Sequence, residues 1–224
     1  MFRLTLPLNM PIREPCESLL NPDKSGKVSV KVPAKASLRR ELLAARALLT
    51  EEDVTEAATV LAAGASALPE LADARTVAAY VSVGREPGTR ALLNALRERG
   101  VRVLLPVLLP DNDLDWAVYE GAEHLLPAGR GLLEPDGPRL GPAAVVEAEA
   151  VLLPGLAVDG AGMRLGRGGG SYDRVLARLS AAGADPALIV LLYDNEVVAR
   201  VPVEPHDHPV DAVVTPAGAR RFTA

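Results

Sequence analysis

The chain has 224 residues, of which 49% are hydrophobic and 24% are charged, and its formal net charge is −5. This composition is typical of a globular protein with a substantial core, and the negative charge argues against a general nucleic-acid-binding surface. The single cysteine, Cys16, excludes an internal disulfide and a cysteine-based metal cluster, and no apolar run approaches the ~20 residues of a membrane span. We therefore expect a cytoplasmic protein with neither a membrane nor a nucleic-acid partner.

Prolines interrupt every possible element in the first 33 residues, where they stand at Pro7, Pro11, Pro15, Pro22 and Pro33. No hydrophobic periodicity survives between them, and the first residues are too broken to form a secretory signal. We predict a disordered N-terminal extension over residues 1–33 and a single domain over residues 34–224.

Residues 35–49 have the pattern of an amphipathic helix with a leucine stripe at Leu38, Leu42, Leu43 and Leu49. Lys35 and Arg39 are four residues apart and therefore share one face, from which they could reach an anionic ligand. A solvated basic face is the alternative interpretation. Thr50, followed by three acidic residues, predicts the N-cap of a second helix that extends to about Leu68.

A βαβ unit is predicted next. Residues 76–83 form a buried strand, Thr89 caps a helix that Gly100 ends, and residues 101–105 form the next strand. Such a unit implies parallel pairing, and ligands then bind beyond the carboxyl ends of the strands. Glu86 follows such an end, so it is either an ordinary loop acid or a binding residue.

Further strands are predicted at residues 114–119, 150–153, 188–193 and, as the last of the chain, 212–215. The only tryptophan, Trp116, lies in the first of these, and a lone aromatic is more often a core residue than a ligand platform. Residues 122–149 are rich in proline and glycine and predict a long connection around the site.

The most informative segment, residues 164–174, reads RLGRGGGSYDR. A buried strand precedes it, and a helix follows with apolar residues at Tyr172, Val175, Leu176 and Leu179. Glycines allow backbone N–H groups to surround an anion, the helix N-terminus adds partial positive charge, and Arg164 and Arg167 add full charges. The segment predicts a phosphate-binding loop, with a flexible surface turn as the alternative.

Known motifs do not explain this segment. No Gly-Lys-Ser/Thr follows at P-loop spacing, and the glycines only approximate a dinucleotide fingerprint. Ser171 does not lie in a nucleophile elbow, and no Ser/His/Asp arrangement stands out.

Asp173 lies beside the predicted phosphate site, where magnesium would bind. A second acidic group follows at residues 206–211, with His206, Asp207, His208 and Asp211. Zinc is disfavoured because the two histidines are two residues apart in a proline-bounded loop and no further nitrogen or sulfur ligand is evident. Magnesium held by Asp173 with Asp207 or Asp211 is the better hypothesis.

Five segments together carry a family resemblance: residues 35–39, 80–89, 154–159, 164–174 and 201–207. Their motifs and order resemble 5-formyltetrahydrofolate cyclo-ligase, also called 5,10-methenyltetrahydrofolate synthetase, over about residues 35–216. The resemblance implies an α/β, Rossmann-like three-layer fold with a mostly parallel central sheet. It implies the ATP- and Mg²⁺-dependent conversion of 5-formyltetrahydrofolate to 5,10-methenyltetrahydrofolate with release of ADP and phosphate, by a monomer or weak homodimer.

The resemblance also assigns roles to single residues. The residues implied to bind ATP are Lys35, Arg39, Arg164, Leu165, Gly166, Arg167, Gly168, Gly169, Gly170, Ser171 and Tyr172. Those implied to contact the folate are Val81, Glu86, Arg167, Gly168, Gly169, Gly170 and Ser171. Magnesium would be held by Asp173 and Asp211, and the catalytic residues would be Arg167, Tyr172 and Asp173.

One position departs from the family pattern, because Ser171 stands where the family usually has a tyrosine. The departure weakens any stacking role at position 171 and leaves Tyr172 as the aromatic residue of the motif. Two other classes remain open: a sugar-phosphate or CoA-ester enzyme of similar fold, which would not need ATP, and a non-catalytic folate- or nucleotide-binding relative.

Overall fold

The computed structural model describes residues 20–22, 28–30, 34–205 and 207–222. The chain divides into two compact units, residues 1–33 and residues 34–224. In the first unit, β1 (Leu20–Pro22) and β2 (Val28–Val30) pair antiparallel. The remaining residues of the predicted disordered extension, 1–19, 23–27 and 31–33, lie outside the described part of the chain.

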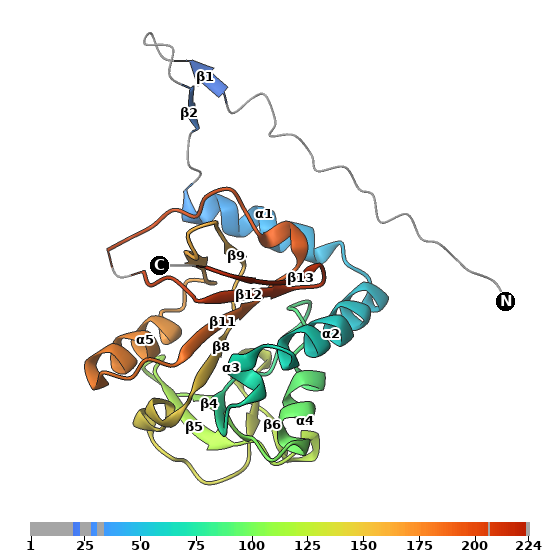
Figure 1. The fold of residues 1–224 in the computed structure, drawn as a ribbon, viewed down its shortest axis with the longest axis vertical. Helices are drawn as coiled ribbons and strands as arrows, with labels where there is room; N and C mark the ends of the chain where they lie inside the picture. The colour runs from blue at the N-terminus through green and yellow to red at the C-terminus, as the bar shows by residue number, and fades with distance from the viewer. Residues whose placement is uncertain (1–19, 23–27, 31–33, 206, 223–224) are drawn as a thin grey trace, which may run out of the picture. The chain divides into compact units, whose positions relative to one another are not determined.

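The second unit combines helices with a central sheet (Figure 1). Its helices are α1 (Lys35–Ala47), α2 (Glu51–Ser66), α3 (Pro69–Ala72), α4 (Arg90–Glu98) and α5 (Ser171–Ala182), with 3₁₀ turns η2 (Ala122–His124), η3 (Gly129–Gly131), η4 (Pro142–Glu147) and η5 (Asp194–Glu196). Its strands are β3 (Thr76–Ala78), β4 (Arg102–Leu108), β5 (Leu114–Val118), β6 (Leu125–Pro127), β7 (Leu133–Pro135), β8 (Ala150–Leu153), β9 (Ala157–Val158), β10 (Arg164–Leu165), β11 (Ala187–Leu191), β12 (Ala212–Thr215) and β13 (Gly218–Arg221).

Seven strands form the central sheet in the order β13-β12-β11-β8-β3-β4-β5. The five inner strands are parallel to one another, and the two edge strands, β5 and β13, run antiparallel to their neighbours. The parallel pairing of β3 with β4 across α4 confirms the predicted βαβ unit. The sheet is mostly parallel, as the resemblance implied.

Helices cover both faces of this sheet, with α2, α3 and α4 on one side and α5 on the other (Figure 1). On β8, Ala150 and Leu152 pack toward the first layer while Val151 and Leu153 pack toward the second, and all four are fully buried. Burial on both faces explains why this strand has an unbroken apolar sequence. The three-layer α/β architecture is thus confirmed, and fully buried Trp116 belongs to its core.

The predicted strand at residues 76–83 is shorter in the structure, because β3 leaves the sheet after Ala78. Beyond it, the buried hydroxyl of Thr89 donates to the Tyr80 carbonyl at 2.8 Å and accepts from the Ser82 amide at 3.0 Å. Thr89 makes no side-chain cap on α4, so the predicted capping role is wrong. Its hydroxyl instead closes the loop that carries Glu86.

Two features of the fold are not evident from the sequence. The proline- and glycine-rich connection contains a hairpin of β6 and β7. The strand at residues 212–215 is not the last, because β13 pairs antiparallel with it. All four residues of β13 are exposed and two are arginines, so no apolar alternation marks it.

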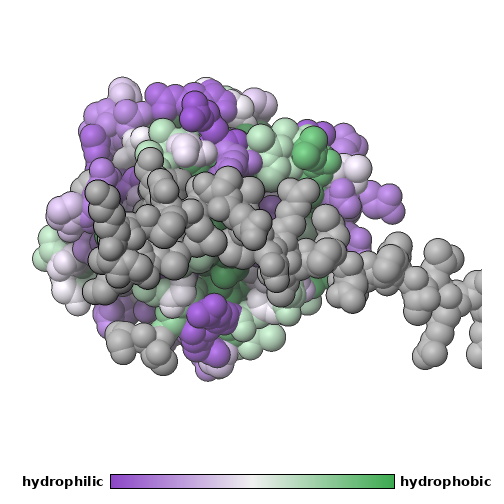
Figure 2. All heavy atoms as spheres, turned by 90° about the horizontal axis from the view of Figure 1, so that it is seen from above, coloured by the Kyte–Doolittle hydropathy of each residue, from purple (hydrophilic) through white to green (hydrophobic). Residues whose placement is uncertain are grey.

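Among the coloured residues in the view of Figure 2, hydrophilic side chains are interspersed with apolar ones, and no broad apolar area is visible. Among the described residues, the exposed large apolar side chains are Leu43, Leu48, Val60, Leu126, Leu140 and Val203. Within the described part of the chain, no helix has the length and apolar character needed to cross a membrane.

Candidate active site

A cavity of about 720 Å³ lies where the strand order of the sheet reverses, with β4 and β8 on either side of β3. Residues that follow β3 and β8, among them Tyr80, Glu86 and Pro154, line it together with the end of β4. Such a switch point at the carboxyl ends of parallel strands is where open α/β sheets bind their ligands.

The cavity brings together segments that are far apart in the sequence. The predicted ligand-binding residues that line it are Lys35, Arg39, Val81, Glu86, Arg164, Leu165, Gly166, Arg167, Gly168, Gly169, Gly170, Ser171, Tyr172 and Asp173. Of the predicted site residues, Asp211 alone does not line it. The residues that line the cavity are therefore brought together by the fold, and the role of each one remains a prediction.

The glycine-rich loop leads directly into α5. Gly168 and Gly170 have φ angles of +93° and +76°, which side-chain-bearing residues rarely adopt, so glycine is required at these two positions. Helix α5 has no side-chain cap at Gly170, and its first three residues line the cavity. The free N–H groups of a helix N-terminus and its dipole favour an anion there, as predicted for a phosphate-binding loop.

Arg164 is the most deeply buried of the cavity's basic groups, with a side chain that is 8% exposed. One nitrogen, Nη1, donates to the Pro154 carbonyl at 2.9 Å, and Nη2 lies 3.7 Å from the Asp173 carboxylate. The Nε atom is buried without a hydrogen-bond partner among the described residues. Burial lowers the pKa of Arg164, which shows the cost of keeping this charge away from water. An anion in the cavity would offset that cost.

Helix α1 supplies two further cations to the cavity. The Nε atom of Arg39 donates to the Gly166 carbonyl at 2.8 Å and thereby ties the helix to the glycine-rich loop. The Nζ atom of Lys35 lies 2.6 Å from Glu204 and 2.7 Å from Asp207. Burial lowers the pKa of Lys35, but the hydrogen bonds to Asp207 and Glu204 outweigh it and raise the pKa above its ordinary value.

The two residues that open α5 after Ser171 have different characters. The hydroxyl of Tyr172 is buried and has no hydrogen-bond partner among the described residues. Burial raises the pKa of Tyr172 well above its ordinary value, so the hydroxyl stays protonated at neutral pH and can donate a hydrogen bond. Asp173 is 46% exposed and borders the cavity, so its carboxylate is accessible to a cation.

Glu86 and Arg167 face each other across the cavity wall. The Nη1 atom of Arg167 lies 3.3 Å from one Glu86 oxygen, while the other accepts from the Val83 amide at 2.9 Å. Glu86 is largely buried, whereas the Arg167 side chain is 55% exposed. Arg167 can therefore move to a ligand while Glu86 stays fixed.

The structure separates Asp211 from Asp173. Asp211 precedes β12 and its carboxylate accepts from the Leu188 amide at 2.7 Å, near the start of the parallel strand β11. It therefore lies at the amino ends of the strands, the edge opposite the cavity. Asp207 does line the cavity, so of the two open alternatives the structure favours Asp207 as the partner of Asp173. His206 lies outside the described residues.

Several cavity residues had no assigned role in the sequence. The hairpin β6–β7 contributes Arg130, Leu132, Leu133 and Glu134 to the wall. The connection was predicted to lie around the site, but its residues follow no motif. Tyr80 is buried in the segment after β3 and also lines the cavity.

The residues present fit both of the implied groups. Among the described residues, the Nε of buried Arg164 has no partner and the N-terminus of α5 has no side-chain cap, and together with the further cations these groups are suited to a polyphosphate. Asp173 and Asp207 can supply one or two carboxylates to Mg²⁺, which usually shares its coordination with substrate phosphates and water. Among the described residues, no group of three or more His, Cys, Asp or Glu is arranged to hold a metal by itself.

Comparisons with known proteins identify the family of the chain. The model of the 5-formyltetrahydrofolate cyclo-ligase family matches residues 31–216. A 5-formyltetrahydrofolate cyclo-ligase from Mycolicibacterium smegmatis is 46% identical over 147 residues, 63% of this chain and 74% of that protein. One from Escherichia coli K12 is 32% identical over 174 residues, 77% of this chain and 94% of that protein.

Similarity extends to a solved structure. The NMR structure of Aquifex aeolicus 5,10-methenyltetrahydrofolate synthetase has a TM-score of 0.72 at 27% identity, and the match covers 85% of this chain and 93% of that one. The comparisons confirm the family resemblance seen in the sequence motifs. They also identify the protein as a ligase of folate and one-carbon metabolism. The chain belongs to the 5-formyltetrahydrofolate cyclo-ligase family.

Proposed function

We propose that the chain cyclises 5-formyltetrahydrofolate to 5,10-methenyltetrahydrofolate at the expense of ATP, with Mg²⁺ bound beside the phosphates. The observation that carries this proposal is the buried guanidinium of Arg164, whose Nε has no partner among the described residues, in a cavity bordered by the glycine-rich loop. A buried positive charge whose N–H lacks an acceptor is stabilised when an anion binds beside it, so the arrangement indicates an anion-binding cavity.

In this proposal the triphosphate binds between α1 and the glycine-rich loop. Lys35, Arg39 and Arg164 contact its oxygens, and the N–H groups around Gly168 and at the start of α5 complete the cradle. Asp173 and Asp207 hold Mg²⁺, which neutralises phosphate charge when bound. Lys35 would then exchange its present carboxylate partners for phosphate.

The folate occupies the other side of the same cavity, next to Glu86 and Val81. Glu86 is fixed by the Val83 amide and can accept hydrogen bonds from the N–H groups of a pteridine ring. Leu132 and Leu133 of the hairpin and Tyr80 offer apolar surface to the ring. Arg167, between the two halves of the cavity, can contact both substrates.

The chemistry follows from the weakness of a formamide as an electrophile. Transfer of the terminal phosphoryl of ATP to the formyl oxygen converts that oxygen into a leaving group, and the neighbouring nitrogen then attacks the formyl carbon and phosphate departs. Phosphoryl transfer requires positioning and charge neutralisation more than covalent help from the protein. Arg167 can stabilise the charge in transit, and the protonated Tyr172 hydroxyl can donate to an oxygen.

The direct test is incubation with 5-formyltetrahydrofolate, monitored by the absorbance of methenyltetrahydrofolate. We expect the absorbance to rise only when ATP and Mg²⁺ are both present. A rise without ATP would contradict the proposed phosphorylation, and nucleotide binding without any rise would indicate a non-catalytic relative.

Alanine variants test the assigned roles. We expect Arg167→Ala and Asp173→Ala to lose most of their turnover, at least ~100-fold, because each removes charge neutralisation from the transferring group. The melting temperature should change little, since both side chains are about half exposed. Exposed Arg174→Ala, on the same helix but outside the cavity lining, is the matched control. Near-native rates in either test variant would refute the role of that residue.

A further inference from the structure

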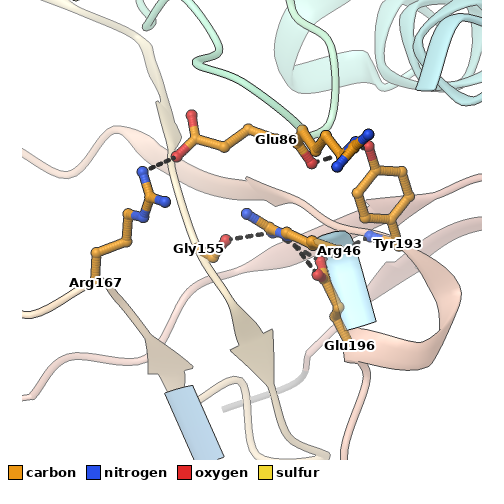
Figure 3. Close-up of polar contacts among 7 residues, drawn as sticks. Arg46, Glu86, Gly155, Arg167, Tyr193 and Glu196 are labelled. Carbon is orange, nitrogen blue, oxygen red and sulfur yellow. Dashed lines mark hydrogen bonds and ion pairs between the residues drawn. The ribbon is translucent and has the colours of Figure 1, made fainter. Parts of the chain in front are cut away.

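A buried ion pair lies outside the lining of the cavity and has no part in the site described so far. Arg46, in the last turn of α1, is 5% exposed and Glu196, at the end of η5, is 1% exposed. The Nε and Nη2 atoms of Arg46 donate to the two Glu196 carboxylate oxygens at 2.6 and 2.9 Å. Figure 3 shows the two side chains meeting in this paired arrangement next to Tyr193.

The same guanidinium also reaches the backbone of the cavity wall. Nη2 of Arg46 donates to the Gly155 carbonyl at 2.7 Å (Figure 3). The preceding carbonyl, that of Pro154, accepts from Arg164 at 2.9 Å. Two buried arginines therefore hold consecutive carbonyls just beyond β8. One of them, Arg164, lines the cavity, whereas Arg46 lines a smaller pocket that shares Glu86 and Arg167 with it.

Arg46 joins three segments that the proposed site depends on. It lies in α1, which also presents Lys35 and Arg39 to the cavity. Its contact with Gly155 fixes the segment after β8. Glu196 in turn accepts from the Tyr193 amide at 3.0 Å, so it is held by its own backbone turn. The pair fixes the end of α1 relative to the carbonyls that orient Arg164.

Stability alone does not account for this arrangement. Burying two charges costs desolvation, and a well-packed apolar pair of similar volume is often as stable or more stable. The Nη1 atom of Arg46 is also buried without a partner among the described residues, which adds to the cost. What an apolar pair could not provide is the hydrogen bond to the Gly155 carbonyl.

We propose that Arg46, held by Glu196, is a positioning residue for the ATP site: it fixes the Pro154–Gly155 carbonyls and the end of α1 so that Arg164, Lys35 and Arg39 converge on the triphosphate. This inference rests on the proposed function, because it takes Arg164 to be a phosphate ligand. It assigns no contact between Arg46 and either substrate.

The decisive variant replaces both partners, as Arg46→Met/Glu196→Leu. We expect it to be more stable than either single variant, because no buried charge is left unpaired and only the hydrogen bonds to the Gly155 carbonyl and the Tyr193 amide are lost. Its KM for ATP and its calorimetric Kd for a non-hydrolysable ATP analogue should nevertheless rise about tenfold, a difference of about 1.4 kcal/mol. If the pair served stability alone, the double variant would recover its affinity for ATP together with its melting temperature. Native ATP affinity in a stable double variant would overturn the proposal.

Arg46→Lys is the second variant, and it remains informative if the double variant does not fold. Lysine keeps a charge opposite Glu196, but it lacks the planar fork that serves the carboxylate and the carbonyl together. We expect weakened ATP binding here as well, and native binding would count against the proposal. Leu71→Ala, a fully buried core change in α3 outside the cavity lining, should lower the melting temperature without altering ATP affinity.

Arg164→Met separates this inference from the proposed function. If Arg164→Met leaves analogue binding unchanged, the proposed phosphate site itself is wrong. If Arg164→Met weakens binding while Arg46→Met/Glu196→Leu does not, the site stands and only the positioning role of Arg46 is refuted.

Discussion

Gly166 and Gly169 stand three residues apart in one loop, yet a side chain would meet different surroundings at each. A Cβ atom at Gly166 would lie 2.9 Å from Nη1 of Arg164, whereas nothing lies within 4 Å of one at Gly169. Because Nη1 is the atom that binds the Pro154 carbonyl, Gly166→Ala must displace the guanidinium.

We therefore expect Gly166→Ala to raise the KM for ATP about tenfold, the typical effect of weakening one charged hydrogen bond. Gly129→Ala is the matched control, because a Cβ there would also meet nothing within 4 Å and the residue lies outside the cavity lining; it should leave the KM unchanged. Steady-state kinetics at saturating folate would decide the matter, and equal KM values for the two variants would mean that Arg164 does not depend on the space at Gly166.

For single residues, the sequence predicts those that lie in a recognisable local motif, and it misses those whose role depends on a distant packing partner. The run from Arg164 to Asp173 is recognisable because glycines, arginines and an acid stand close together in the chain. Arg46 looks like one more cation on a basic helix, and nothing local distinguishes it from Arg40, which is exposed. Its partner Glu196 is 150 residues away. The choice between Asp207 and Asp211 likewise depends on which edge of the sheet each one reaches.

Helix α5 is attached to the far edge of the sheet by an ion pair. The Nη2 atom of Arg178 lies 2.6 Å from a carboxylate oxygen of Asp113, whose side chain is 15% exposed. This hydrogen bond lowers the pKa of Asp113 from its ordinary value of 3.8. A carboxyl group with a lowered folded-state pKa stabilises the fold above its unfolded-state pKa, and the contribution is lost as the pH falls through the folded-state value.

Asp113→Asn should therefore reduce the free energy of unfolding by about 1 kcal/mol at neutral pH, as expected for one paired carboxylate at a partly exposed site. The difference from the wild type should persist down to about pH 5, shrink as the pH falls below 3.8, and vanish only below the lowered folded-state pKa. Urea unfolding of both proteins across this range measures it. A difference that is independent of pH would show that packing, not charge, is responsible.

Elements with a strong local pattern were predictable, and elements defined by distant partners were not. Helix α2 begins with the expected cap, since the Thr50 hydroxyl accepts from the Asp53 amide and the Asp53 carboxylate accepts from the Thr50 amide. The continuous apolar run of β8 also identifies it. In contrast, β3 ends early because of the Thr89 contacts seven and nine residues away, and β13 exists only because β12 offers it an edge.

The molecule as a whole should not need its first 30 residues. The three apolar core clusters of the described part of the chain draw on residues from Leu38 onward, and the family match begins at residue 31. A variant that starts at residue 31 should keep the melting temperature and the ATP-dependent turnover of the full chain. A variant that starts at residue 41, which lacks Lys35 and Arg39, should lose the turnover. Reduced stability of the first variant would contradict the predicted boundary near residue 33.

The ammonium of Lys35 already has two acidic neighbours, Glu204 and Asp207, before any nucleotide arrives. A phosphate that binds this lysine must compete with both carboxylates, so the affinity for nucleotide should be lower than a lysine without these neighbours would give. If the lysine charge moves to the phosphate, the negative potential around Glu204 and Asp207 rises, which would favour a divalent cation bound with the phosphates. Metal and nucleotide should therefore bind with positive cooperativity, through a contact that links the first helix to a loop near the end of the chain.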